Sequence, residues 1–255
     1  CSCPNSGSYS GCVEKLDVYQ TMSKGIIYYT DNRLGEPIFS VVQKQIQKSG
    51  LPIVSVSLAP INFGRNIVLP GNPGYTSMIR QIVTALEASE ADYVFFCEHD
   101  VLYHPSHFAF VPANDDVYYY NMNNWRWAYP GNKLIRYDGL TSLSQLCVYR
   151  QLALNHFRHR WQKMGEVGLE KFQTKDPHFA RLWGYEPGRR PVGNGGLLKE
   201  TSDTWSSPFP NVDIRHQTTF SLRKVSRKDF AHQPTGWTET TLDNIPGWDI
   251  QSLFA

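Results

Sequence analysis

Residues 93–101 read YVFFCEHDV, and this stretch decides the fold prediction because an apolar run ends there in two acids. Residues 93–97 are apolar on both faces, as in a central strand of a parallel sheet. Residues i and i+2 of an extended strand face the same side, so Glu98 and Asp100 should converge while His99 points away. Ligands of open α/β sheets bind beyond the carboxyl ends of the strands. The stretch therefore predicts a strand that brings two carboxylates to a ligand site.

The two acids predict a cation site. Neighbouring carboxylates repel each other unless a positive charge lies close by. Hard divalent cations such as Mn²⁺ and Mg²⁺ take oxygen ligands and often bridge to phosphate. The alternative is that Asp100 caps the turn after the strand and that Glu98 is simply solvated.

The elements before this stretch alternate between strand and helix. Strands are expected at 25–30 and 51–58, which are rich in β-branched and aromatic residues. Helices are expected at 39–50, which ends at a glycine, and at 75–92, where apolar residues recur at helical spacing. This alternation predicts an α/β fold with a doubly wound, mostly parallel sheet.

The second half of the chain is less regular. Helical spacing predicts a helix at 151–165, whose segment HFRHRW (156–161) is expected on an exposed face. The other expected elements are strands at 117–131, 140–150 and 211–221 and a short helix at 176–184.

Cysteine content and charge narrow the class of protein. Cys97 and Cys147 lie in apolar runs, whereas the other three of the five cysteines lie in the Gly/Ser-rich start, CSCPNSGSYSGC. Those three are either the remains of a zinc site or free thiols of a mobile tail. The odd count argues against a secreted disulfide framework and predicts a cytoplasmic location. A net charge of +2 does not require a nucleic-acid partner, and no stretch approaches the ~20 apolar residues of a transmembrane segment.

The segment ADYVFFCEHDVLYHPSHF resembles the part of GT-A fold glycosyltransferases that carries their acid-x-acid ("DxD") motif. The resemblance implies a Rossmann-like GT-A fold with a central, mostly parallel sheet, flanking helices and an irregular C-terminal extension. It implies transfer of a sugar from a nucleoside-diphosphate sugar to an acceptor hydroxyl, with Mn²⁺ or Mg²⁺. Glu98 would then contact the ribose or the metal, and Asp100 would ligate the metal. Glu98 replaces the family's first Asp, a variation that the motif tolerates.

Further matches extend the resemblance over roughly residues 24–220, specifically in the first hundred and loosely afterwards. YYTDNR (28–33) ends the first strand, so Thr30, Asp31 and Arg33 are implied to bind the nucleoside. GYTSMIR places Arg80 near the donor, and PNVDIRHQTTFS offers His216 as a further metal ligand, although a lone histidine is more often an ordinary polar residue.

The acceptor side is implied by weaker matches. KDPHFARLWG resembles the segment of inverting members in which an acid begins a helix, so Asp176 is the candidate base, although helix capping also explains it. Asp138 and Glu170 are alternative bases, and a retaining mechanism would need none. Trp125 and Trp127, with Asp138, could bind the acceptor, but core packing explains the two tryptophans equally well.

A basic loop follows His216. Its cations either swing over the diphosphate or form a solvated surface: Arg223, Lys224, Arg227 and Lys228.

Three segments are expected. Residues 1–23 form a flexible start, 24–220 the transferase domain, and 221–255 a tail that acts as a lid or packs passively. Within the domain, 24–111 would bind the donor and 112–220 the acceptor. That acceptor could be a glycan, a lipid-linked sugar, a protein or a modified nucleic acid.

Two other functions stay open. The first is a metal-dependent hydrolase or nucleotidyltransferase, although DNRLGEP after the first strand has only one glycine for a phosphate loop. The second is a non-catalytic nucleotide- or sugar-binding module, against which the retained acids argue.

Overall fold

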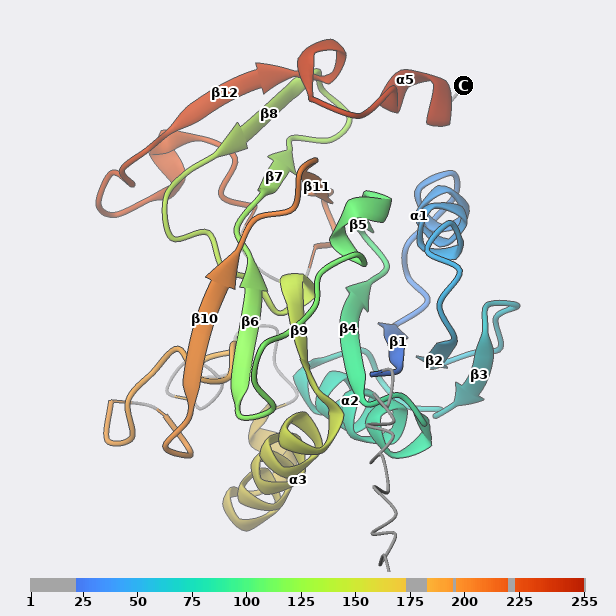
Figure 1. Cartoon of the computed structure of the whole chain (residues 1–255), viewed down its shortest axis with the longest axis vertical. Helices are drawn as coiled ribbons and strands as arrows, with labels where there is room; N and C mark the ends of the chain where they lie inside the picture. Colours follow the sequence, from blue (N-terminus) through green and yellow to red (C-terminus); the bar gives the residue numbers. More distant parts are fainter. Residues whose placement is uncertain (1–21, 173–182, 195, 220–222, 255) are drawn as a thin grey trace, which may run out of the picture.

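The predicted central strand is present as β4 (Tyr93–Glu98), in the middle of a seven-stranded sheet (Figure 1). The computed structural model describes residues 22–172, 183–194, 196–219 and 223–254. The sheet order is β10-β6-β9-β4-β1-β2-β3. Its other strands are β1 (Lys24–Thr30), β2 (Ile53–Ser57), β3 (Arg65–Val68), β6 (Val117–Asn121), β9 (Leu146–Tyr149) and β10 (Thr201–Trp205).

Most of the strand pairs in this sheet are parallel. β1 runs parallel to β2 and β4, β2 to β3, and β6 to β10, whereas β9 is antiparallel to both of its neighbours, β4 and β6. The predicted α/β fold with a mostly parallel central sheet is therefore confirmed. The parallel order also places the carboxyl ends of β1 and β4 side by side.

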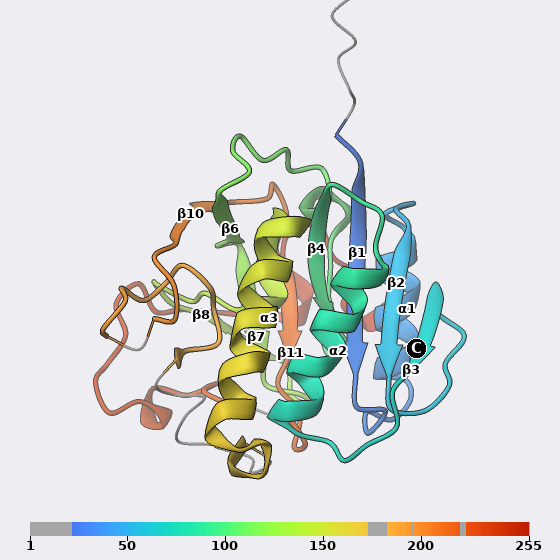
Figure 2. The same ribbon diagram turned by 90° about the horizontal axis from the view of Figure 1, so that it is seen from below.

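Helices cover both faces of this sheet. One face carries α1 (Ile38–Gln47), and the other carries α2 (Tyr75–Ala88) and α3 (Arg150–Val167), which lie side by side (Figure 2). Alternate residues of β1 serve the two cores, because Ile26 packs with α1 and Ile27 packs with α2 and α3. A strand buried on both faces reads as a continuous apolar run, which is why β1 and β4 were predictable.

A second, five-stranded sheet lies beyond the carboxyl ends of β4 and β6 (Figure 1). Its strand order is β12-β8-β7-β11-β5. Buried residues of β5, β7, β8 and β11 belong to the same hydrophobic core as those of α1. Its strands are β5 (Val101–Leu102), β7 (Asn124–Trp127), β8 (Lys133–Arg136), β11 (Asn211–Ile214) and β12 (Thr238–Thr241). Short helices complete the fold: η1 (Pro105–His107), η2 (Leu143–Gln145), η3 (Leu169–Phe172), η4 (Arg227–Asp229), η5 (Leu242–Asn244) and α5 (Ile250–Leu253).

Several predicted elements differ in extent. The strand expected at 117–131 is divided into β6 and β7, which belong to different sheets, and the strand expected at 211–221 ends at Ile214. The sequence did not predict β3, β8, β10 or β12. β10 and β12 have no buried hydrophobic face, so no apolar alternation marks them. The helix expected at 176–184 lies almost wholly outside the described residues.

The expected segments are joined by strand pairing. β4 and β5 come from the predicted donor half, yet they pair with β9 and β11 from the predicted acceptor half. β12 comes from the expected tail and pairs with β8. Among the described residues, none of the helices combines the length and the apolar character needed to cross a bilayer.

His107 in η1 is a buried titratable group of the core. Its ring is fully buried and packs against Phe95 and Trp205. Asn121 Nδ2 lies 3.1 Å from Nδ1, and burial lowers the pKa of His107 from 6.5 to about 3. The folded protein therefore holds this ring neutral at pH values where the unfolded chain protonates it.

We predict that the free energy of unfolding falls as the pH falls from 6.5 toward 3. In that window the unfolded state binds more protons, which costs up to ~1.4 kcal/mol per pH unit for each such group. His107→Phe should make this dependence shallower in urea titrations at several pH values, whereas the same substitution at the exposed His232 is the control. An unchanged slope in His107→Phe would contradict the assignment.

Candidate functional site

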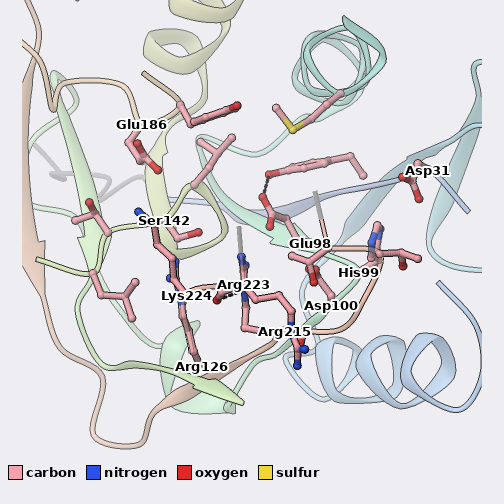
Figure 3. A pocket seen from close by; sticks show the side chains of 18 of the residues that line it. Asp31, Glu98, His99, Asp100, Arg126, Ser142, Glu186, Arg215, Arg223 and Lys224 are labelled. Atoms are coloured by element: carbon pink, nitrogen blue, oxygen red, sulfur yellow. Dashed lines mark hydrogen bonds between the residues drawn. The ribbon is translucent and has the colours of Figure 1, made fainter. Parts of the chain in front are cut away.

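A cavity of ≈ 860 Å³ opens beyond the carboxyl ends of β1 and β4 (Figure 3). Its lining comes from those two strand ends, the first turns of α2, residues 137–143, residues 185–186 and the segment after β11. Because these segments are far apart in the sequence, the cavity exists only once both sheets have formed. Its place beyond the carboxyl ends of the strands is where ligands of open α/β sheets bind.

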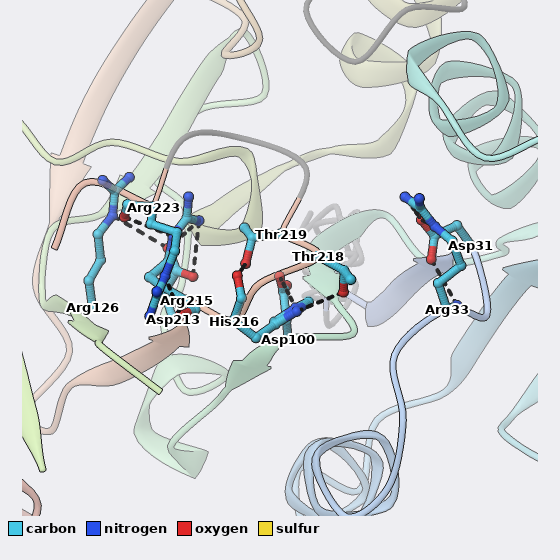
Figure 4. A network of polar contacts seen from close by, with 10 residues as sticks. All are labelled: Asp31, Arg33, Asp100, Arg126, Asp213, Arg215, His216, Thr218, Thr219 and Arg223. Carbon is cyan, nitrogen blue, oxygen red and sulfur yellow. Dashed lines mark hydrogen bonds and ion pairs between the residues drawn. The ribbon is translucent and has the colours of Figure 1, made fainter. Parts of the chain in front are cut away.

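Two lining residues, His99 and Asp100, form a group suited to a metal together with the adjacent, buried His216. One ligand atom from each of His99, Asp100 and His216 lies within 4.8 Å of the others. His216 Nε2 is 3.4 Å from Asp100 Oδ2, and its Nδ1 is 3.0 Å from Thr218 Oγ1 (Figure 4). Two imidazoles beside one carboxylate suit a divalent transition-metal ion such as Mn²⁺ better than Mg²⁺.

Backbone pairing creates this metal group. β4 ends at Glu98, and His99 and Asp100 form a turn rather than a continued strand. The prediction that His99 points away from the site is therefore wrong, because the alternation of an extended strand no longer applies after Glu98. β11 pairs with β5, and the Ile214 amide donates to the Asp100 carbonyl at 2.8 Å, which brings His216 to the turn.

Glu98 and Asp100 hold their protons differently. Burial and the charge of Asp100 raise the pKa of Glu98 to about 8, and Tyr29 Oη donates to Glu98 Oε1 at 2.7 Å. Burial would also raise the pKa of Asp100, but the contact with His216 and the charges of His99 and Arg215 outweigh it and lower that pKa. Glu98 lies outside the three-residue group, so its role as a metal ligand stays a prediction.

The end of β1 forms another wall of the cavity. Thr30 and Asp31 line it, and Gln81 Nε2 of α2 donates to the Thr30 carbonyl at 2.8 Å. Arg33 does not line the cavity, but its Nη2 lies 2.6 Å from Asp31 Oδ2. Arg80 is exposed and does not line the cavity, where α2 contributes Ser77, Met78 and Gln81, so its place near the donor stays a prediction.

The opposite wall carries positive charge. Arg223 and Lys224, from the predicted basic loop, line the cavity, whereas Arg227 and Lys228 do not. Arg223 is fixed by backbone contacts, since its Nε donates to the Arg215 carbonyl at 3.1 Å. The first two cations of the loop therefore face the site. Their contact with a diphosphate stays a prediction.

The expected acceptor residues lie in different places. Trp125 and Trp127 are 9% and 3% exposed, belong to the core and do not line the cavity, so core packing describes their position. Asp138 is exposed at the rim, between the lining residues Tyr137 and Gly139. The sequence analysis did not select Tyr137.

Of the candidate bases that the structure describes, neither Asp138 nor Glu170 lines the cavity. Asp176 lies outside the described residues, and Glu170 is exposed in η3 and away from the lining. Glu186, which the sequence analysis missed, lines the cavity opposite the metal group (Figure 3). It stands in an irregular Gly/Pro segment without a motif, so no sequence signal marked it.

A buried polar network supports the wall that carries Glu186. Arg160 of α3 is 1% exposed, and its Nη1 donates to the Gly184 carbonyl at 2.8 Å and to Tyr75 Oη at 3.0 Å. Its Nη2 lies 2.9 Å from Nε2 of His156, whose Nδ1 is 2.8 Å from a carboxylate oxygen of Glu200. The expected exposure of this helix face is therefore wrong, because the 184–186 segment and Glu200 cover it.

No family model matches the sequence, and no curated protein matches it. Among solved structures, the chain is similar to a glycosyltransferase involved in the glycosylation of the major capsid of PBCV-1, with 10% identity over 72% of this chain and 82% of that chain and a TM-score of 0.42. It is similar to S. aureus TarS in complex with UDP-GlcNAc, with 12% identity, 78% and 60% coverage and a TM-score of 0.43.

A third similar structure is glucosyl-3-phosphoglycerate synthase from Mycobacterium tuberculosis in complex with Mn²⁺, UDP and phosphoglyceric acid. Its identity is 10%, the coverage is 58% of this chain and 66% of that chain, and the TM-score is 0.35. Likenesses of this size carry no argument about function, which rests on the site itself.

We predict that Arg160→Met destabilises the protein strongly. The substitution leaves the Gly184 carbonyl, Tyr75 Oη and His156 Nε2 without their donor, and each lost partner costs roughly 1–3 kcal/mol. Urea unfolding should therefore show a loss of about 3 kcal/mol or more. Arg158→Met on the same helix is the control, because its exposed pair with Glu87 is worth less than about 1 kcal/mol. Equal losses in both variants would contradict the role of Arg160.

Proposed function

We propose that this chain is a metal-dependent glycosyltransferase that moves a sugar from a nucleoside-diphosphate sugar to an acceptor hydroxyl. The observation that carries the proposal is the group of His99, Asp100 and His216, in which His99 and Asp100 follow the central strand β4 and line a cavity with a cationic wall. A bound Mn²⁺ would supply charge neutralisation for a diphosphate leaving group. Mn²⁺ is preferred here to Mg²⁺ because of the two imidazoles.

The chain's own residues would divide the work along the cavity. Asp31 and Thr30 would bind the nucleoside at the end of β1, where Arg33 holds the Asp31 carboxylate in place. The guanidinium of Arg223 and the amine of Lys224 lie on the far wall and would stabilise negative charge that develops on the leaving group.

An inverting transfer needs a base for the acceptor hydroxyl, and Glu186 is the carboxylate of the cavity lining that lies apart from both the metal group and the proposed nucleoside position. Burial raises the pKa of Glu186, which brings its basicity closer to that required near neutral pH. Asp176, the sequence-based candidate, remains a second proposal. The proposed acceptor is a glycan, a lipid-linked sugar, a protein or a modified nucleic acid, and the proposed location is the cytoplasm.

Binding of a nucleoside diphosphate should require both the metal and Asp100. UDP, GDP and CDP, each tested with and without Mn²⁺, should include one that raises the melting temperature only with Mn²⁺. At a ligand concentration of 100 Kd the gain is about 2.7 kcal/mol. Asp100→Ala should remove this gain, because the group loses its carboxylate, while the exposed Asp116→Ala keeps it.

Activity assays with the nucleotide sugar that binds separate the other functions. Metal-dependent binding of a nucleoside diphosphate without sugar transfer would favour a binding module. Release of phosphate or sugar to water without any acceptor would favour a hydrolase. An Asp100→Ala protein that still binds nucleotide with Mn²⁺ would remove the metal assignment.

Glu186→Gln should lower the transfer rate about 10²- to 10⁴-fold, the range expected for a lost general base, because an amide accepts no proton. Nucleotide binding with Mn²⁺ should stay unchanged. Asp176→Asn, measured in parallel, decides between the two carboxylates, and Glu90→Gln on the exposed surface is the control. Normal turnover by Glu186→Gln would move the base to another residue.

A further inference from the structure

Arg126 on β7 is a buried cation whose donors are only partly used. The residue is 9% exposed and lines the cavity. Among the described residues, its Nε and Nη1 have no hydrogen-bond partner, and the nearest acid atom, Asp213 Oδ2, is 3.6 Å from Nε. Buried N–H groups without acceptors are costly. A ligand with acceptor oxygens could therefore bind the unused donors of Arg126.

The charges around Arg126 are unbalanced. Asp213 lies between two arginines, because Arg215 Nη1 is 3.2 Å from both of its carboxylate oxygens. Arg223 and Lys224 add further positive charge to the same part of the cavity lining. This part of the lining therefore carries four cations beside the carboxylates of Asp213 and Glu186, and an anionic ligand would improve the balance of charge.

The orientation of Arg126 is fixed. Its Cζ lies 5.6 Å from the ring centroid of Tyr137, which also lines the cavity. β7 and β11 pair in parallel with Arg126 opposite Asp213, so both strands hold the guanidinium in register. A guanidinium held in one plane can present its N–H groups to the paired oxygens of a phosphate or a carboxylate.

Arg126 lies apart from the metal group. Across the cavity the order is Asp31, then Asp100, then Arg215, then Arg126, in both close views (Figures 3 and 4). A diphosphate held at Asp100 and His216 would therefore meet Arg215 before Arg126. The cavity offers a second position for an anion, at the end remote from the proposed nucleoside position.

We propose that Arg126 binds an acidic group of the acceptor, so that the substrate that receives the sugar carries a phosphate or a carboxylate. The identification of this molecule as the acceptor rests on the proposed function. The anion site itself does not rest on that function, because the unused donors of Arg126 and the surrounding positive charge are enough to bind an anion.

The test measures anion binding with the donor position filled. Wild-type protein is saturated with Mn²⁺ and the nucleoside diphosphate that stabilises it, and inorganic phosphate or acetate is then titrated by calorimetry. The wild type should bind at least one of the two anions, and the stronger of them identifies the acid. Arg126→Met should bind it at least tenfold more weakly, and Arg126→Lys should lie between the two. Arg136→Met on β8 is the matched control, because this exposed arginine lies outside the cavity lining.

The nucleotide arm distinguishes the possible sources of the anion. Arg126→Met should keep the affinity of the wild type for the nucleoside diphosphate with Mn²⁺. A loss of that affinity would assign Arg126 to the donor's phosphates and overturn the proposal. Equal binding of the anion by Arg126→Met and the wild type, or binding by neither, would also overturn it.

Failure of the proposed function gives a different result. If no nucleoside diphosphate binds the wild type, the glycosyltransferase proposal and the acceptor assignment fall. The titration with Mn²⁺ alone then still decides whether Arg126 holds an anion. Circular dichroism checks that each variant is folded, and if Arg126→Met does not fold, the weaker binding expected of Arg126→Lys decides the outcome.

Discussion

The backbone hydrogen bond from Ile214 to the Asp100 carbonyl is the link on which the candidate site depends. It extends the pairing of β11 with β5 and brings His216 to a turn that is more than one hundred residues earlier in the chain. Without this contact His99 and Asp100 would lack the second histidine of the metal group. The metal group is therefore a product of the second sheet as much as of the central one.

Electrostatics divides the cavity into regions with different roles. Near the metal group, two acids lie close together. Burial raises the pKa of Glu98, whereas the contact with His216 and the charges of His99 and Arg215 lower the pKa of Asp100. Toward Arg126 positive charge exceeds negative charge, because Arg126 and Arg215 share the carboxylate of Asp213. A cavity with a cation site at its centre and an arginine with unused donors beyond it suits a reaction between two anionic molecules. The proposed sugar transfer and the proposed acidic acceptor both follow from this division.

The fold was predictable where burial leaves a periodic trace in the sequence. β1, β2, β4, α1, α2 and α3 were expected close to their observed positions, because each has a clear apolar pattern. β10 and β12 were missed since they have no buried face, and β6 and β7 were taken for one strand because both are rich in apolar residues. The exposure expected for His156 and Arg160 was wrong because polar partners distant in sequence bury them.

The sequence by itself determined the central strand, the position of Glu98 and Asp100 at its end, and the association of Thr30 and Asp31 with the neighbouring strand end. These features depend on local periodicity and on the geometry of parallel strands. Only the tertiary structure decided that His99 joins Asp100 and His216, and that Glu186 and Arg126 line the same cavity. Contacts of this kind depend on how two sheets pack and on which polar groups are left without partners, and neither leaves a pattern in the order of the residues.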